Sequence, residues 1–359
     1  SGTKDLWAVE VDKGEVRGPP RPVRRNVGIS WSLGFSEDGS FFYTNYTRRF
    51  NTFVAPFDLR TGEIDLSRSE PLLGSNIGAQ WSPDGAFLAM TRQEELEGDQ
   101  GTGESLIIRD METGEERRLA PQVDLGYARK EWSDDGRSIL AYGSDATGPA
   151  EGRSALWLIE VATGEATAVV DLPEVIQGVW ASDGQSIIYA NRGRIVLRDA
   201  DSGRARELFS DPLLASRLIA LSPDGVWLAV GVSTDPDFPL GGPRIFDGGR
   251  LLLVPTGGGE ARELAIINSP GSVNDLHWTS DGEYIRFWLD GREGVDDGAT
   301  LFQVHRDGSA LEEIWTTEEE LGHMAHNPSF DRVAYTLIEN DLEIWVMENL
   351  LSVGGEGRR

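Results

Sequence analysis

Hydrophobic and polar positions alternate along most of the chain in short runs that are separated by glycine-containing turns. Seven times a bulky residue leads into a Ser/Asp/Gly turn and a further apolar run, and the clearest copy reads WSPDG, from Trp81 to Gly85. Alternation with a period of two predicts half-buried strands, and Asp-Gly between two such runs predicts a hairpin. The turn positions are 41 to 57 residues apart and fall at Asp38, Asp84, Asp135, Asp183, Asp224, Asp281 and Ser329.

The second half of each repeat is equally regular. An apolar run ends in Thr-Gly-Glu or a close variant, as in Ser105 to Glu115 and Leu156 to Glu165, and a short run follows. Each repeat therefore predicts four antiparallel strands, a to d, with the Asp-Gly turn between a and b and the Thr-Gly-Glu turn between c and d. Such a unit, recurring roughly every 40–50 residues, predicts an all-β, seven-bladed β-propeller with four-stranded antiparallel blades.

The two ends of the chain carry one strand signal too many. Seven a–b turns stand against eight c-type runs, because Asp5 to Glu15 has no a–b pair before it. We expect this N-terminal strand to close the ring in the last blade, since closure removes an exposed sheet edge. A chain that begins inside a longer protein is the alternative. The prediction is one propeller domain over residues 1–359, with blades at about 27–70, 74–122, 126–171, 174–211, 215–267, 271–316 and 321–350 plus 4–25.

The turn sequence resembles that of a known family. Trp81-Ser82-Pro83-Asp84-Gly85 matches the W-S-P-D-G hallmark of the TolB-like, WD-repeat-like bacterial β-propellers in full, and the other copies match it at three or four positions. The resemblance extends over essentially the whole chain. It implies a propeller that serves as a binding platform or as a gate beside a catalytic domain, and it favours a periplasmic or extracytoplasmic location.

Composition narrows the function classes. Lys and Arg number 33 against 60 Asp and Glu, so the net charge of −27 argues against a basic nucleic-acid-binding face. It fits either a solvated, self-repelling surface or an acidic mouth for a cation or basic partner. The absence of cysteine excludes disulfides and thiolate chemistry. No apolar run is long enough to predict membrane insertion, and we expect a monomer.

Motifs for catalysis are missing from the sequence. It contains no G-x-S-x-G elbow, no H-E-x-x-H and no phosphate-binding glycine loop, so we predict no catalytic residue, no metal site and no cofactor. The repeated aspartates are interpreted as turn residues, because Asp can bond to the backbone of its own turn while Gly adopts a positive φ. His323 and His326 would point to opposite faces of a strand.

A binding face follows from the predicted topology. The tight a–b and c–d turns lie on one face of the disc, whereas the b–c connections lie on the other and are long at residues 44–52, 91–104, 143–154, 231–249 and 289–299. Long, variable loops on a rigid scaffold favour that face for binding. The starts of the innermost strands should rim the channel there, and they predict a ligand-binding mouth formed by Trp31, Asn76, Tyr127, Arg129, Gln177, Arg217, Asn274, Asp275 and His323. A water-filled channel with ordinary polar lining is the alternative.

Three functions compete at this point. The first is a non-catalytic binding or sensing propeller, part of a larger bacterial protein, that presents its loop-rich face and channel mouth to a protein, peptide or small ligand. The second is an enzyme at the channel mouth, such as a polysaccharide lyase, for which Tyr127, Arg129, Arg217 and His323 are the candidate groups. The third is a gating domain for a fused protease or kinase.

Overall fold

The chain is built almost entirely from antiparallel strands. The computed structural model describes residues 5–25, 31–37, 39–58, 61–95, 102–120, 122–125, 129–146, 152–172, 177–191, 193–200, 202–235, 249–267, 272–290, 298–309, 311–319 and 321–348. Contacts divide the chain into two compact units. Unit 1 comprises Ser1–Arg49, Gln93–Gly103 and Ile338–Arg359, and unit 2 comprises Phe50–Arg92 and Glu104–Leu337.

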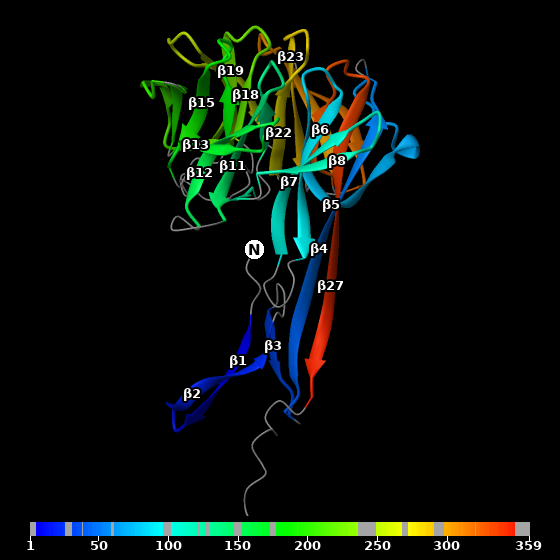
Figure 1. The fold of residues 1–359 in the computed structure, drawn as a ribbon, viewed down its shortest axis with the longest axis vertical. Helices are drawn as coiled ribbons and strands as arrows, with labels where there is room; N and C mark the ends of the chain where they lie inside the picture. The colour runs from blue at the N-terminus through cyan, green and yellow to red at the C-terminus, as the bar shows by residue number, and fades with distance from the viewer. Residues whose placement is uncertain are drawn as a thin grey trace, which may run out of the picture. The chain divides into compact units, whose positions relative to one another are not determined.

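Four sheets of unit 2 share one meander pattern, in which each strand pairs with the next along the chain (Figure 1). The first, to which β9 (Val123–Asp124) adds at β11, contains β10 (Lys130–Trp132), β11 (Ser138–Asp145), β12 (Ser154–Glu160) and β13 (Ala166–Val170). The second contains β14 (Gly178–Trp180), β15 (Ser186–Asn191), β16 (Arg194–Asp199) and β17 (Ala205–Ser210). The third contains β18 (Leu214–Leu221), β19 (Trp227–Ser233), β20 (Gly249–Pro255) and β21 (Arg262–Ile267). The fourth contains β22 (Ser272–Trp278), β23 (Tyr284–Asp290), β24 (Ala299–His305) and β25 (Leu311–Thr317).

A larger sheet holds the remaining strands of unit 2. Its strand order is β26-β27-β4-β5-β6-β7-β8. The long strand β5 belongs to two four-stranded groups, β26-β27-β4-β5 and β5-β6-β7-β8. Phe53 and Val54 of β4 pair with the start of β5, while the end of β5 leads into the β6–β8 meander. The bounds are β4 (Phe41–Pro56), β5 (Glu70–Trp81), β6 (Phe87–Glu95), β7 (Thr102–Asp110), β8 (Glu116–Leu119), β26 (Leu321–His326) and β27 (Arg332–Met347), with the short 3₁₀ helix η1 (Leu66–Arg68) between β4 and β5.

The strand order does not confirm the predicted seven blades. The described strands of unit 2 form six four-stranded groups, because the predicted loop at 44–52 is absent and β4 runs through it unbroken. That segment, TNYTRRFNT, contains no Gly or Pro and is rich in Thr and aromatic residues, which favour a continued strand. β27 likewise continues through 337–342.

The predicted ring closure is not confirmed either. The N-terminal strand β1 (Leu6–Asp12) pairs with β2 (Glu15–Arg24) in a two-stranded sheet of its own. In the described part of the chain, the place beside β27 is taken by β4 instead. Closing the short loop between β1 and β2 costs less chain entropy than bringing β1 to a strand more than 300 residues away. β1 therefore forms its backbone hydrogen bonds with the neighbouring strand β2.

Indole hydrogen bonds join neighbouring groups of unit 2. The innermost strands contact one another in the order β5, β10, β14, β18, β22, β26 and back to β5. At four of these junctions a tryptophan Nε1 donates to a backbone carbonyl of the preceding group, at 3.0 to 3.4 Å. The pairs are Trp81 with Ala325, Trp132 with Gln80, Trp180 with Glu131 and Trp278 with Ala220. The repeated aromatic position therefore acts between sheets as well as within the apolar core.

Unit 1 consists of short antiparallel pieces. The β1–β2 hairpin turns at Lys13 and Gly14, both with positive φ. β3 (Ser32–Phe35) pairs with the first residues of β4. Residues 338–347 of β27 complete this unit, where Tyr43 of β4 lies 6.3 Å from the Trp345 ring. In the part of the chain that the structure describes, no helix is long and apolar enough to cross a membrane.

Candidate ligand-binding site

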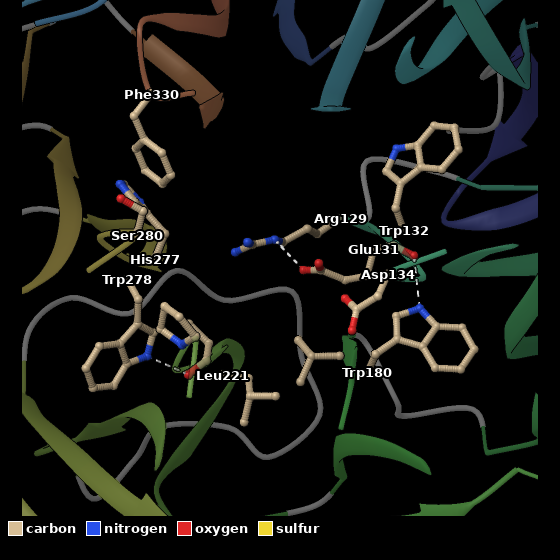
Figure 2. Close-up of a pocket in the computed structure, with 13 residues that line it drawn as sticks. Arg129, Glu131, Trp132, Asp134, Trp180, Leu221, His277, Trp278, Ser280 and Phe330 are labelled. Atoms are coloured by element: carbon tan, nitrogen blue, oxygen red, sulfur yellow. Dashed lines mark hydrogen bonds and ion pairs between the residues drawn. The ribbon is translucent and has the colours of Figure 1, made fainter. Parts of the chain in front are cut away.

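A cavity of about 450 Å³ lies within unit 2. Its walls combine aromatic rings, an arginine and two carboxylates (Figure 2). The residues that line it are Arg129, Glu131, Trp132, Asp134, Val179, Trp180, Ala220, Leu221, Pro223, His277, Trp278, Ser280 and Phe330.

The cavity belongs to the innermost strands. Its lining residues come from β10, β14, β18 and β22, from Arg129 just before β10, and from a–b turns that include the one after β26, so several groups meet around it. Asp134, Pro223, Ser280 and Phe330 are themselves turn residues. The cavity is therefore at the a–b turn end of these strands, whereas the sequence favoured the end that carries the b–c loops.

Arg129 reaches across the middle of the cavity. Its Nη1 donates to the carbonyl of Leu276 at 3.1 Å, and its Nε forms an ion pair with Glu131 Oε1 at 2.8 Å. Leu276 is on β22, which is three steps from β10 in either direction around the order of innermost strands. The guanidinium thus bridges opposite walls, and Figure 2 shows it extended into the open space between them. About a quarter of the side chain remains exposed.

Carboxylates determine the sign of the charge at this end. Arg129 and Glu131 neutralise each other, which leaves Asp134, an exposed acid, in the lining. Four turn aspartates, Asp84, Asp135, Asp224 and Asp281, occupy a–b turns outside the lining, and each accepts from a hydroxyl two residues earlier and from a backbone N–H two residues later. The hydroxyl bond is the main cause that lowers the pKa of these carboxyls below the usual range at Asp84, Asp135, Asp224 and Asp281. All four are therefore ionised at neutral pH.

Two departures from the repeat pack against each other, and one of them, Phe330, lines the cavity. His326 stands where other copies have Trp, and Phe330 occupies the Gly position of the turn with φ 55°. The His326 ring is stacked on Phe330 at 5.6 Å and lies 4.3 Å from Phe57 and 4.8 Å from His277. Burial lowers the pKa of His326 well below its usual range, so this side chain is a neutral aromatic filler.

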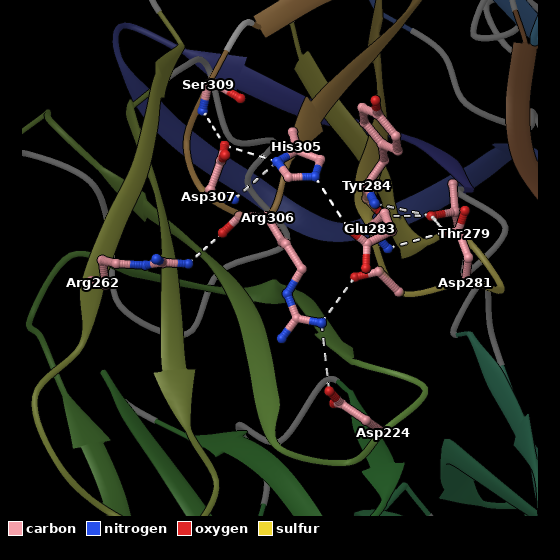
Figure 3. A network of polar contacts seen from close by, with 11 residues as sticks. Asp224, Arg262, Thr279, Asp281, Glu283, Tyr284, His305, Arg306, Asp307 and Ser309 are labelled. Carbon is pink, nitrogen blue, oxygen red and sulfur yellow. Dashed lines mark hydrogen bonds and ion pairs between the residues drawn. The ribbon is translucent and has the colours of Figure 1, made fainter.

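A second polar cluster lies on the same turn end, between the β18–β21 and β22–β25 sheets (Figure 3). Arg306 stacks over the cavity residue Trp278 at 6.0 Å, donates to the Gly282 carbonyl at 3.3 Å and pairs with Asp224 at 3.6 Å. Next to it, His305 contacts Asp307 at 2.8 Å and a Glu283 carboxylate oxygen at 3.2 Å. The Asp307 bond is the main cause that raises the pKa of His305. Arg306 therefore packs on the Trp278 ring and connects this cavity residue to the polar cluster.

The predicted mouth residues have different positions in the structure. Of those whose side chains the structure describes, only Arg129 lines the cavity. Gln177 is buried and donates to the Ile219 carbonyl at 3.1 Å, and His323 is bonded to Gln80 at 3.0 Å. Asn76 is fully buried, donates to the Leu73 carbonyl and accepts from Arg92. Trp31 lies in unit 1 and is 54% exposed. Tyr127 and the side chains of Arg217, Asn274 and Asp275 lie outside the described residues.

The sequence contains a signal for the cavity residues that were not predicted from it. Most of them belong to the W-S-P-D-G repeat, which was interpreted as structural throughout. Leu221 in place of Trp and Phe330 in place of Gly are two of the positions where the repeat departs from its consensus, and both line the cavity. Among the described residues, no three His, Asp or Glu side chains are grouped so that they could hold a metal ion.

Comparison with known proteins shows similarity of fold. No protein-family model matches the sequence, and no curated protein matches it. A putative TolB from Agrobacterium tumefaciens is 18% identical with a TM-score of 0.57, over 82% of this chain and 99% of that one. TolB from Acinetobacter baumannii is 16% identical with a TM-score of 0.52, over 80% of this chain and 63% of that one.

An enzyme shares the same architecture. An oligogalacturonate lyase from Vibrio parahaemolyticus is 12% identical with a TM-score of 0.52, over 86% of this chain and 96% of that one. At such identities the likeness concerns fold alone. The chain has the all-β fold of a TolB-like β-propeller, which confirms that prediction.

Proposed function

We propose that this protein is a binding propeller whose cavity receives a basic group of a protein or peptide partner. The observation that carries the proposal is the charge of the cavity. Arg129 is neutralised by Glu131, which leaves Asp134 as the carboxylate of the lining that has no ion-pair partner among the described residues. A cation entering there gains attraction to the Asp134 carboxylate without having to displace an existing ion pair.

The aromatic lining supports the same ligand class. Trp132, Trp180 and Trp278 use their indole N–H groups in bonds between sheets, so their rings present only apolar and π surface to the cavity. A Lys or Arg side chain is suited to such a lining because its methylene stem packs on apolar surface and its charged head interacts favourably with ring faces. The net charge of −27 would also steer a basic partner toward the protein.

The loop face and the predicted channel mouth remain a second proposed surface. Arg129 is common to the predicted mouth and the cavity, so a ligand that enters from either end would meet its guanidinium. Partner binding on the b–c loops is part of this proposal, together with a monomeric chain. The specific partner would be recognised by its basic residue and an adjacent apolar group.

Charge-switch variants test the proposal. The probe is a short peptide with Arg next to Trp, and the matched control peptide has Glu in place of Arg. We expect the Arg peptide to bind at least about tenfold more tightly in calorimetry, because one charge-assisted contact corresponds to about 1.5–3 kcal/mol. Asp134→Asn should weaken this binding, and Glu131→Gln should shift the preference toward the Glu peptide because Arg129 loses its internal partner.

The exposed turn acid Glu63 provides the control substitution, Glu63→Gln, which should leave both affinities unchanged. Equal binding of the two peptides, or variants at Asp134 and Glu131 that behave like Glu63→Gln, would contradict the proposal. Cleavage of oligogalacturonate with a rise in ultraviolet absorbance would support the enzymatic alternative instead.

A further inference from the structure

The C-terminal part of β27, residues 338–347 of unit 1, is a strand with one occupied edge. One side of β27 pairs with β4, and β26 pairs with the other side only from His326↔Val333 to Leu321↔Leu337. Among the residues that the structure describes, no strand pairs with that side of β27 beyond Leu337. A row of backbone N–H and C=O groups is therefore available at this edge for another strand.

Side chains on this strand are sorted by face. Leu342, Ile344 and Val346 point to one side and are 61%, 69% and 48% exposed. The intervening positions Asp341 and Glu343 point to the other side and are exposed as well. One face is thus apolar from Leu342 to Val346, and the other carries the acids Asp341 and Glu343 followed by Trp345.

The acidic face is held in place by aromatic contacts. Trp345 lies on it next to Glu343, and the Trp345 indole donates to the Glu343 carboxylate at 2.6 Å. Arg24 lies over the Trp345 ring at 5.0 Å and donates to the Tyr43 hydroxyl at 3.1 Å. These contacts fix the strand in an extended form, which lowers the entropy cost for an incoming partner strand.

The edge itself specifies the chemistry of its partner. In an added strand, residues alternate between the two faces and lie beside the residues of β27 on the same face. The complement of this edge is therefore an extended segment in which apolar residues alternate with basic ones. A second copy of β27 would place Asp341 and Glu343 beside the same acids, and like charges directly opposite one another are destabilising.

We propose that residues 338–347 of β27 bind an extended segment of a partner protein, with alternating basic and apolar residues, as an additional strand of the sheet. Backbone hydrogen bonds supply affinity in this mode, and the alternating side chains supply specificity. The surface lies wholly in unit 1 and does not depend on the cavity of unit 2.

A pair of synthetic peptides tests the proposal on the full chain. The probe is a fluorescent ten-residue peptide that alternates lysine with valine, and the control peptide alternates glutamate with valine. We expect only the lysine peptide to bind in fluorescence anisotropy, with affinity that falls as salt is raised. The double variant Asp341→Lys/Glu343→Lys should weaken binding at least about tenfold, because two attractive cross-strand pairs become repulsive.

A matched double variant separates local from overall charge. Glu112→Lys/Glu115→Lys makes the same charge change at an exposed turn of unit 2, and it should weaken binding less than about twofold. Ile344→Ser tests the apolar face and should weaken binding while leaving the melting temperature unchanged, since Ile344 is mostly exposed. Equal losses in the two charge variants would overturn the proposal.

Amide hydrogen exchange locates the bound peptide. Strand addition predicts slower exchange at residues 338–347 in the presence of the lysine peptide. Protection at Arg129 to Asp134 instead would place the peptide in the cavity and overturn this proposal while supporting the proposed function. A dimer in light scattering that dissociates in the Ile344→Ser variant would assign the edge to a second copy and would also overturn it.

Discussion

The same alternation of apolar and polar residues leads to different burial in the two units. Twelve of the eighteen exposed large hydrophobic residues in the described chain lie in unit 1, although unit 2 is more than three times longer. All six clusters of buried apolar residues lie in unit 2. Trp7 of β1 is 52% exposed, whereas Trp288 of β23 is 1% exposed.

This difference teaches what alternation can specify. A period of two predicts a strand with one apolar face, and both units obey it. Burial also requires a second layer, and in unit 2 each sheet has neighbours that supply one. The strands of unit 1 leave apolar faces in solvent, which is typical of interaction surfaces.

The largest expected effect compares two tryptophans. Trp288→Ala should lower the free energy of unfolding by about 3–5 kcal/mol, because the ring is buried and packs edge-on against Trp315 at 5.5 Å. Trp7→Ala should change it by less than about 0.5 kcal/mol. Urea unfolding followed by circular dichroism measures both. A comparable loss at Trp7 would mean that the hairpin face is covered in solution.

The second comparison concerns a buried lysine and the pH dependence of the free energy of unfolding. Lys130 is 0% exposed, and burial lowers its pKa from 10.5 to about 7, while its Nζ donates to the Gly78 carbonyl. At a pH between these two pKa values, Lys130 is protonated in the unfolded chain and neutral in the folded chain. The free energy of unfolding should therefore rise with pH, by up to about 1.4 kcal/mol per pH unit.

Lys130→Met should remove this slope in urea titrations between pH 7 and 10. The matched variant Lys13→Met, at an exposed hairpin turn of unit 1, should keep it. If the slope survives in Lys130→Met, another buried group is responsible for it.

The smallest effect concerns indole hydrogen bonds. Trp81→Phe leaves the Ala325 carbonyl without its donor inside unit 2 and should destabilise the fold by about 1–2 kcal/mol. Trp345→Phe removes a bond to the exposed acid Glu343 and should destabilise it by less than about 0.5 kcal/mol. Thermal unfolding resolves the two, and a reversed order would show that the unit 1 contact is the stronger one.

Much of the fold could be predicted from the turns. Six of the seven copies join the first two strands of a four-stranded group, and the turn aspartates bond as their interpretation required. The seventh copy, around Gly39, has the same turn chemistry but joins β3 to β4 in unit 1. Turn residues specify a hairpin and carry no information about what lies beyond it. The number of groups therefore depended on whether 44–52 forms a loop, and no residue there ends a strand.

The site was less predictable for a physical reason. Rim positions were chosen by polarity, yet the buried amides of Asn76 and Gln177 donate to backbone carbonyls of the fold. A polar residue in a strand can satisfy its neighbours or a ligand, and sequence does not separate the two. Arg129 was predicted by the same positional rule as the others, and it reaches the cavity because its long side chain extends to the Leu276 carbonyl of another strand.

The indole bonds have a consequence for the number of repeats. In each bonded pair the acceptor directly precedes the repeat's aromatic position, so Gln80 stands before Trp81 and Glu131 before Trp132. At four of the six described junctions, an indole donor of one repeat is thus matched by a backbone acceptor of the preceding repeat. Inserting or deleting a repeat that has the tryptophan would therefore keep an indole bond available at the neighbouring junction. The number of repeats is then limited at one place, where β4 from the first part of the chain pairs with β27 from the last part.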